Sequence, residues 1–142
     1  MIDFFSSLIS ILTLLHLIGS EIFFSFICNR LSLSNISPTN DLNLLSDVDL
    51  IVEAVFEDPK IKAEITQEVE GIIPKHCIFA SNTSTLPITD LAKASSRPDQ
   101  FIGIHFFSPV EKMRLVEIIR GKETNNTAVA KALDFVRQIK KT

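Results

Sequence analysis

The sequence predicts an α/β fold with a mainly parallel β-sheet, and three successive patterns support this prediction. Residues 50–56 are mostly apolar and β-branched and are bounded by acidic residues, which is typical of a strand buried in a parallel sheet. A helical pattern follows, and then a second short apolar run at 77–80. Strand, helix and strand within about thirty residues form a βαβ unit, whose crossover is right-handed.

A helix is expected directly after the first strand. Asp58 is a favourable N-cap residue, and Pro59 suits the first helical position because no N–H donor is needed there. Pro74 marks the end of the helix. The apolar residues between these limits recur at the helical period and indicate one buried face: Ile61, Ile65, Val69 and Ile72.

The remaining elements follow in order along the chain. The second strand ends in a polar turn, 81–85, and a short helix at about 88–94 leads to a third strand at 101–107. A fourth strand is expected at 113–119. The final helix begins near residue 127, and its apolar face is formed by Val129, Ala132, Leu133 and Val136.

Length, charge and cysteine content exclude some classes of protein. At 142 residues, the chain is long enough for one domain with a sizeable core. Charged residues make up 22% of the chain and the net charge is −3, which does not suit an electrostatic nucleic-acid binder. The two cysteines, Cys28 and Cys77, form neither a metal-binding spacing nor a disulfide framework, so we expect no metal site.

Residues 1–29 differ in composition from the rest, and we expect a boundary between this hydrophobic segment and an α/β part at 30–142. No charged residue occurs from 4 to 20, so a short membrane anchor over 4–28 is one interpretation. A buried apolar segment and sequence foreign to the native protein, as from a wrongly joined exon, are the others. A signal peptide is not expected, because the only preceding charge is Asp3.

Polar residues follow the ends of three predicted strands. In open α/β sheets, ligands bind outside the carboxyl ends of the strands. That edge carries Glu57 after the first strand and residues 81–84 after the second. Ser108 follows the third strand, and His105 lies close to the same end. The sequence therefore predicts a ligand site at this edge.

His105 and Glu117 lie twelve positions apart in two successive apolar runs. A catalytic base must reach the reacting proton, and an acceptor for its other ring nitrogen fixes its tautomer. If the two runs are neighbouring strands, His105 can be the base and Glu117 its orienting carboxylate. The alternative is a hydrogen-bonded core histidine with a surface partner, and the place of His105 at the ligand edge favours the first interpretation.

The phosphate-binding turn of a dinucleotide fold is missing from the sequence. Such a fold opens with a strand and a G-x-G-x-x-G turn, whose backbone approaches the pyrophosphate. No two of the four glycines are close enough to form that turn: Gly19, Gly71, Gly103 and Gly121. We therefore predict an incomplete Rossmann-type, doubly wound sheet that lacks the first glycine-loop βαβ unit.

Several stretches resemble the 3-hydroxyacyl-CoA dehydrogenase family, and most of all its members within multifunctional fatty-acid β-oxidation proteins of the mitochondrial trifunctional α-subunit type. These stretches are 36–39, 48–58, 80–84, 103–109 and 115–118, so the resemblance extends from about residue 30 to 142. It implies an NAD-binding domain, with NAD as the cofactor for oxidation of L-3-hydroxyacyl-CoA to 3-ketoacyl-CoA. The implied small-molecule partner is the 3-hydroxyacyl-CoA substrate, and no nucleic acid is expected.

The resemblance also implies roles for individual residues. His105 aligns with the base that takes the hydroxyl proton, and Glu117 with the carboxylate that orients it. Ser84 aligns with a serine that contacts substrate and nicotinamide. The implied cofactor-binding positions are Ala54, Glu57, Lys62, Ser84 and Ser108, the last of which is asparagine in many members. As hydride leaves the substrate, a neutral imidazole accepts the proton and a carboxylate stabilises the imidazolium.

The resemblance covers only part of the family's architecture. The first βαβ unit has no counterpart in this sequence, and neither does the helical C-terminal domain through which members bind acyl-CoA and dimerise. We therefore expect this chain alone to bind NAD weakly or not at all. A degenerate, non-catalytic domain and a membrane-tethered binding module are the alternative functions. The resemblance implies a mitochondrial location, and this expectation does not rest on a targeting signal in the sequence.

Overall fold

The computed structural model describes residues 39–142 of the chain. The predictions for the hydrophobic segment at 1–29, for Cys28 and for a membrane anchor over 4–28 concern residues outside this part. Within residues 39–142, no helix is both long enough and apolar enough to cross a membrane.

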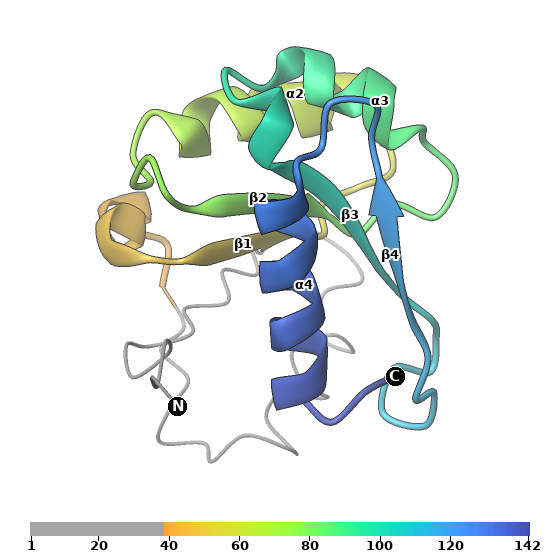
Figure 1. Ribbon diagram of the computed structural model, residues 1–142. Coiled ribbons are helices and arrows are strands. Elements are labelled where there is room, and N and C mark those ends of the chain that lie inside the picture. Colours follow the sequence, from red (N-terminus) through yellow and green to blue (C-terminus); the bar gives the residue numbers. More distant parts are fainter. Residues whose placement is uncertain (1–38) are drawn as a thin grey trace.

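The described residues form one four-stranded β-sheet with helices on both of its faces (Figure 1). A short 3-10 helix, η2, precedes the first strand, and two further 3-10 turns, η3 and η4, precede the third. The elements in chain order are η2 (Leu42–Asp47), β1 (Leu50–Glu53), α2 (Pro59–Glu70), β2 (Ile78–Ser81), α3 (Ile88–Leu91), η3 (Ala92–Ala94), η4 (Pro98–Gln100), β3 (Phe101–Phe106), β4 (Val116–Arg120) and α4 (Asn126–Gln138).

The strands lie in the order β1-β2-β3-β4. The pairs β1–β2 and β2–β3 are parallel, whereas β4 runs antiparallel to β3. The prediction of an α/β fold with a mainly parallel, Rossmann-like sheet is therefore confirmed. Because the first three strands run in one direction, their carboxyl ends meet at a single edge of the sheet.

Apolar side chains cover both faces of the sheet. On one face, α4 packs Ala128, Ala132 and Phe135 against alternate residues of the strands, such as Ile102 and Ile104. On the other face, α2 and α3 cover a second cluster, which includes the stacked rings of Phe79 and Phe101 with centroids 5.3 Å apart. Strand residues buried on both faces explain why these runs are almost continuously apolar in the sequence.

Two strand boundaries differ by three residues from those predicted, and the others differ by at most one residue. The first strand ends at Glu53 rather than at 56: its pairing with β2 stops there, and the Glu53 carboxylate accepts a hydrogen bond from the Val55 N–H (2.7 Å). The fourth strand begins at Val116 rather than at 113. Residues 110–112 form a turn, closed by the Met113 N–H that donates to the Pro109 carbonyl, and the Arg114 carbonyl accepts a hydrogen bond from the Thr142 N–H. Apolar character alone did not distinguish strand from turn in these segments.

The start of α2 was predicted correctly, and its buried face was predicted in part. The Asp58 side chain accepts hydrogen bonds from the first-turn N–H groups of Lys60 and Ile61, which confirms it as the N-cap. Ile61, expected on the buried face, is 40% exposed. Val69 is fully buried as expected, and Ile65 and Ile72 pack against the same apolar cluster. The other fully buried side chains of this helix, Lys62 and Thr66, were not part of the expected face.

Helix α4 begins close to the predicted position. The Asn125 side chain caps it by accepting a hydrogen bond from the Ala128 N–H at 2.8 Å. Ala132 and Val136 are buried as expected, whereas Leu133 is 43% exposed. Phe135 lies on the buried face in place of Leu133. The buried face of α4 is therefore rotated slightly about the helix axis relative to the predicted face.

Candidate active site

The polar residues predicted at the ligand edge do follow the carboxyl ends of the strands. Glu57 lies between β1 and α2, and Ser84 lies in the turn after β2. His105 is the next-to-last residue of β3. The parallel arrangement of β1, β2 and β3 therefore brings segments that are far apart in the sequence to one edge.

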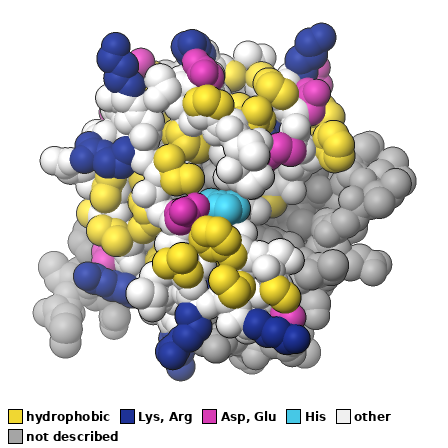
Figure 2. Space-filling model, turned by 90° about the vertical axis from the view of Figure 1, so that its right-hand side faces the viewer, with side chains coloured by type: hydrophobic (Ala, Val, Ile, Leu, Met, Phe, Trp, Pro, Cys, Tyr) yellow, Lys and Arg dark blue, Asp and Glu magenta, His cyan; other side chains and the backbone are white. Residues whose placement is uncertain are grey.

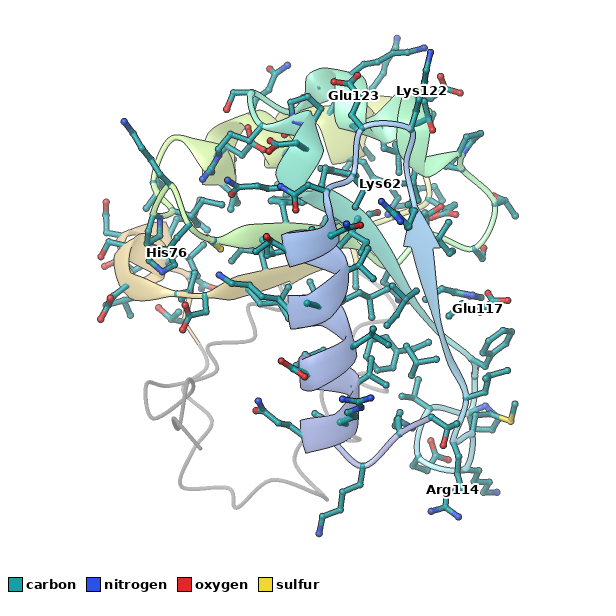
Figure 3. All side chains as sticks on the ribbon, in the orientation of Figure 1. Lys62, His76, Arg114, Glu117, Lys122 and Glu123 are labelled. Carbon is teal, nitrogen blue, oxygen red and sulfur yellow. The ribbon has the colours of Figure 1, made fainter. Side chains whose placement is uncertain are left out.

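His105 and Glu117 are paired directly across β3 and β4, so the predicted neighbouring of their strands is confirmed. The Nδ1 atom of His105 lies 2.8 Å from Oε2 of Glu117. The His105 side chain is 16% exposed and that of Glu117 50%. Figure 3 shows Glu117 projecting from β4 on the side away from α4. The pair therefore lies at the rim of the structure, where a ligand has access to it.

This geometry suits a histidine that acts as a base. When the Nδ1 proton is donated to the Glu117 carboxylate, the Nε2 atom of His105 presents its lone pair. The ring of Phe107 lies against that of His105, with centroids 4.6 Å apart. Exposed apolar side chains near this end of β3 and β4 include Met113 and Leu115. Figure 2 shows a histidine beside an acidic side chain on a face where hydrophobic side chains gather.

The Glu57 carboxylate holds the turn that follows β2. Its Oε1 atom accepts hydrogen bonds from the Thr83 hydroxyl (2.6 Å), the Ser84 N–H (2.9 Å) and the Thr85 N–H (3.1 Å). Burial alone would raise the pKa of Glu57, but these hydrogen bonds and the nearby Lys62 ammonium lower it from 4.5 to about 2. Glu57 is therefore ionised throughout the physiological pH range.

A buried ion pair lies beneath this turn. The Lys62 ammonium is 2.8 Å from Oε1 of Glu53, and both side chains are almost fully buried. The same ammonium lies 3.4 Å from Oε2 of Glu57. The other Glu53 oxygen accepts a hydrogen bond from the Ser81 hydroxyl at 2.7 Å. Lys62, predicted to line the cofactor, thus points inward and joins two carboxylates.

Asn82 is a further residue of this edge that sequence reasoning did not single out. Its side-chain oxygen accepts a hydrogen bond from the Phe106 N–H at 2.9 Å, and its own N–H donates to the Glu53 carbonyl. Asn82 therefore connects the ends of β1, β2 and β3, and it joins the Ser84 turn to the strand that carries His105. The signal in the sequence was its place in the polar turn 81–85, within the stretch 80–84 that resembles the family.

The other predicted cofactor positions lie at the same edge. Ala54 follows β1 directly and is half-buried, and Ser108 is exposed in the segment after β3. Among residues 39–142, no three His, Cys, Asp or Glu side chains are placed so as to hold a metal ion. Cys77 is buried on the opposite side of the sheet from α4, and burial raises its pKa to about 12.

Comparison with known proteins assigns the chain to a family. The family model for the NAD-binding domain of 3-hydroxyacyl-CoA dehydrogenase matches residues 29–142. This chain belongs to the 3-hydroxyacyl-CoA dehydrogenase family. The resemblance found in the sequence motifs is thereby confirmed over nearly the same residues.

Curated relatives of this chain are much longer than the chain itself. The fatty acid oxidation complex subunit alpha of Idiomarina loihiensis is 48% identical over 110 residues, which are 78% of this chain and 15% of that protein. The corresponding subunit of Colwellia psychrerythraea is 46% identical over 110 residues, again 15% of its length. The chain thus spans about one-seventh of these relatives.

Solved structures of the family share the fold of the described residues. The (S)-3-hydroxybutyryl-CoA dehydrogenase of Ralstonia eutropha is 40% identical with a TM-score of 0.74, and the similarity covers 77% of this chain and 38% of that one. The dehydrogenase part of multifunctional enzyme 1 from C. elegans is 38% identical with a TM-score of 0.73, covering 86% and 29%. The Rossmann-like assignment of the sheet therefore rests on both topology and similarity.

Proposed function

We propose that this chain carries the proton-transfer part of an NAD-dependent L-3-hydroxyacyl-CoA dehydrogenase site. The observation that supports the proposal most strongly is the His105–Glu117 pair, joined at 2.8 Å at the carboxyl edge of a Rossmann-like sheet. Family membership and the fatty acid oxidation subunits among its relatives indicate the substrate class, a 3-hydroxyacyl thioester of coenzyme A.

In the proposed reaction, the substrate hydroxyl donates its proton to Nε2 of His105. The Glu117 carboxylate accepts a hydrogen bond from the Nδ1–H of His105, which holds that proton on Nδ1, and its negative charge stabilises the imidazolium that forms. The acceptor for the hydride from the substrate carbon would be supplied by NAD when it is bound. Ser84 is proposed to contact the substrate and the nicotinamide from the turn after β2, as the family resemblance implies.

The residues at this edge fit the nicotinamide-ribose end of NAD. The Oε2 atom of Glu57 is the less engaged oxygen of that carboxylate, and 34% of the side chain is exposed, so it is available to a ribose hydroxyl. Ala54 follows β1 directly, and Ser108 lies in the segment after β3. Lys62 acts from beneath by holding Glu57. No glycine-rich turn for the pyrophosphate occurs in the sequence.

The proposal is tested by assaying the purified chain for NADH-dependent reduction of acetoacetyl-CoA. We expect His105→Gln to lower kcat by about 10²–10⁴-fold, because a general base contributes a factor of that order. His76→Gln is the matched control, since His76 is 59% exposed and pairs with Asp49 at the other end of β1. Turnover that His105→Gln leaves unchanged would refute the assignment of the base.

The missing glycine turn favours a second candidate, a non-catalytic domain that keeps the sheet without binding the whole cofactor. A fluorescence titration with NADH separates the two candidates. Saturable binding together with turnover supports the dehydrogenase site. A folded chain that neither binds NADH nor reduces acetoacetyl-CoA would contradict it and support the non-catalytic domain.

A further inference from the structure

The Glu57 carboxylate accepts several hydrogen bonds from protein donors and is therefore more than a free ligand-binding group. Its Oε1 atom receives the Thr83 hydroxyl and the N–H groups of Ser84 and Thr85, and the hydroxyls of Ser84 and Thr85 lie at 3.4 Å and 3.3 Å. This oxygen is therefore fully engaged within the protein. The three residues that bind it are those that make the turn after β2.

The other side of the Glu57 carboxylate is supported from the interior. Lys62 is 1% exposed, and its ammonium bridges Glu57 Oε2 at 3.4 Å and Glu53 Oε1 at 2.8 Å. Glu53 is in turn fixed at the end of β1 by the Val55 N–H and by the Ser81 hydroxyl of β2. Glu57 thus stands between a buried, rigid ion pair and an exposed turn.

From this arrangement we propose that Glu57 is a positioning residue for the reaction: it fixes the turn 83–85 and thereby sets where Ser84 meets the substrate. The inference rests on the proposed function, because it takes the Ser84 hydroxyl to contact the reacting groups. The backbone N–H groups of Ser84 and Thr85 find their acceptor in this carboxylate. Without it, two adjacent donors of the turn lose the partner that orders them.

The two oxygens of the Glu57 carboxylate have different partners. Oε1 holds the turn, and Oε2 faces Lys62 and the solvent-accessible edge. A ribose hydroxyl at Oε2 would share one rigid carboxyl group with the Ser84 backbone. Cofactor placement and Ser84 placement are then coupled through a single side chain, and Lys62 with Glu53 sets the position of both.

The first test is amide hydrogen exchange of the whole chain, followed by NMR. In Glu57→Ala, the Ser84 and Thr85 amides are expected to exchange about tenfold faster or more, because their charged acceptor is gone. Glu57→Gln retains one acceptor oxygen and is expected to rescue part of the protection. The amides of Ile102 and Ile104 in β3 report the global fold and stay unchanged. Glu64→Gln, on the exposed side of α2, is the matched control.

The second test separates positioning of Ser84 from direct binding of the cofactor. If Glu57 acts through Ser84, Glu57→Gln lowers kcat for acetoacetyl-CoA reduction, and that loss largely disappears in a Ser84→Ala background. A variant with raised KM for NADH and unchanged kcat would overturn the proposal, since Glu57 would then be only a cofactor ligand. Losses in kcat that add independently would overturn it as well.

Failure of this inference is distinguishable from failure of the proposed function. Unchanged exchange of the Ser84 and Thr85 amides in Glu57→Ala refutes the positioning role whether or not NADH binds. A wild-type chain without NADH binding or turnover refutes the proposed function and with it the inference, and the exchange result then describes only how the turn is held.

Discussion

Replacing Lys62 by methionine is the most direct test of the buried ion pair between Lys62 and Glu53. Methionine retains the length and packing of the lysine stem but removes the ammonium. The Glu53 carboxylate, which is 1% exposed, is then left as a buried charge without its counter-ion. Glu57 loses the same partner, although its side chain is 34% exposed and water can replace the ammonium there.

The cost follows from the geometry of the pair. Removal of one partner from a buried ion pair costs about 3–5 kcal/mol, because the remaining charge is uncompensated. Glu53 keeps two donors, the Val55 N–H and the Ser81 hydroxyl, both at 2.7 Å. We therefore expect the lower end of this range, about 3 kcal/mol, which is a large share of the roughly 5–15 kcal/mol that stabilises a typical domain.

Urea unfolding followed by circular dichroism measures this difference in the free energy of unfolding. The double variant Glu53→Gln with Lys62→Met has no unpaired buried charge and is expected to regain roughly 1–3 kcal/mol relative to the single variant. Lys60→Met, on the exposed side of α2, is the control and should stay within about 0.5 kcal/mol of wild type. A Lys62→Met chain as stable as that control would refute the reasoning.

Three further predictions concern other residues. The pKa of Glu57 is about 2 instead of 4.5, so its stabilising contribution is complete above pH 4.5 and is lost as the pH falls toward 2. With a discount for its 34% exposed side chain, we expect about 1–2 kcal/mol, and Glu57→Gln should flatten the stability curve in that pH window, as measured by urea unfolding. In Gly103→Ala, the new Cβ would lie 2.7 Å from Ile88 Cδ1 and 2.9 Å from Ile119 Cβ, so we expect a loss of about 1–3 kcal/mol in thermal unfolding; an unchanged Tm would contradict this. Cys77, with its pKa raised to about 12 by burial, should remain unlabelled by a thiol reagent at about pH 8 in the native state, and peptide mapping after labelling checks this.

The architecture was predictable because each element carries its own local signal. Asp58 and Pro59 define the start of α2 through capping chemistry, and the run at 101–107 is apolar because strand β3 is covered on both faces. Signals of this kind depend only on neighbours in the sequence. Local signals did not predict the structure where a side chain contacts a partner far away in the sequence. At the end of β1, for example, the Glu53 side chain is buried and contacts Lys62 and Ser81.

The buried face of α2 shows the same limit. A lysine is read as a solvent-exposed residue in any amphipathic pattern, since its charge is costly to bury. Lys62 is buried here because Glu53 from the preceding strand supplies the opposite charge. In the site, pairing of the strands around His105 and Glu117 was predictable from two apolar runs. The turn held by Glu57 was not, because its donors lie 26 to 28 positions further along the chain.

The pairing of β3 with β4 has a consequence for how the proposed acid–base pair is encoded in the sequence. His105 and Glu117 face each other because of one antiparallel register, and a slip of a single residue would move Glu117 to the opposite face of the sheet. Both side chains lie within the segment 101–120. The dyad is thus specified by one short hairpin of low contact order. An insertion or deletion that shifts this register would therefore separate the two side chains without changing either residue.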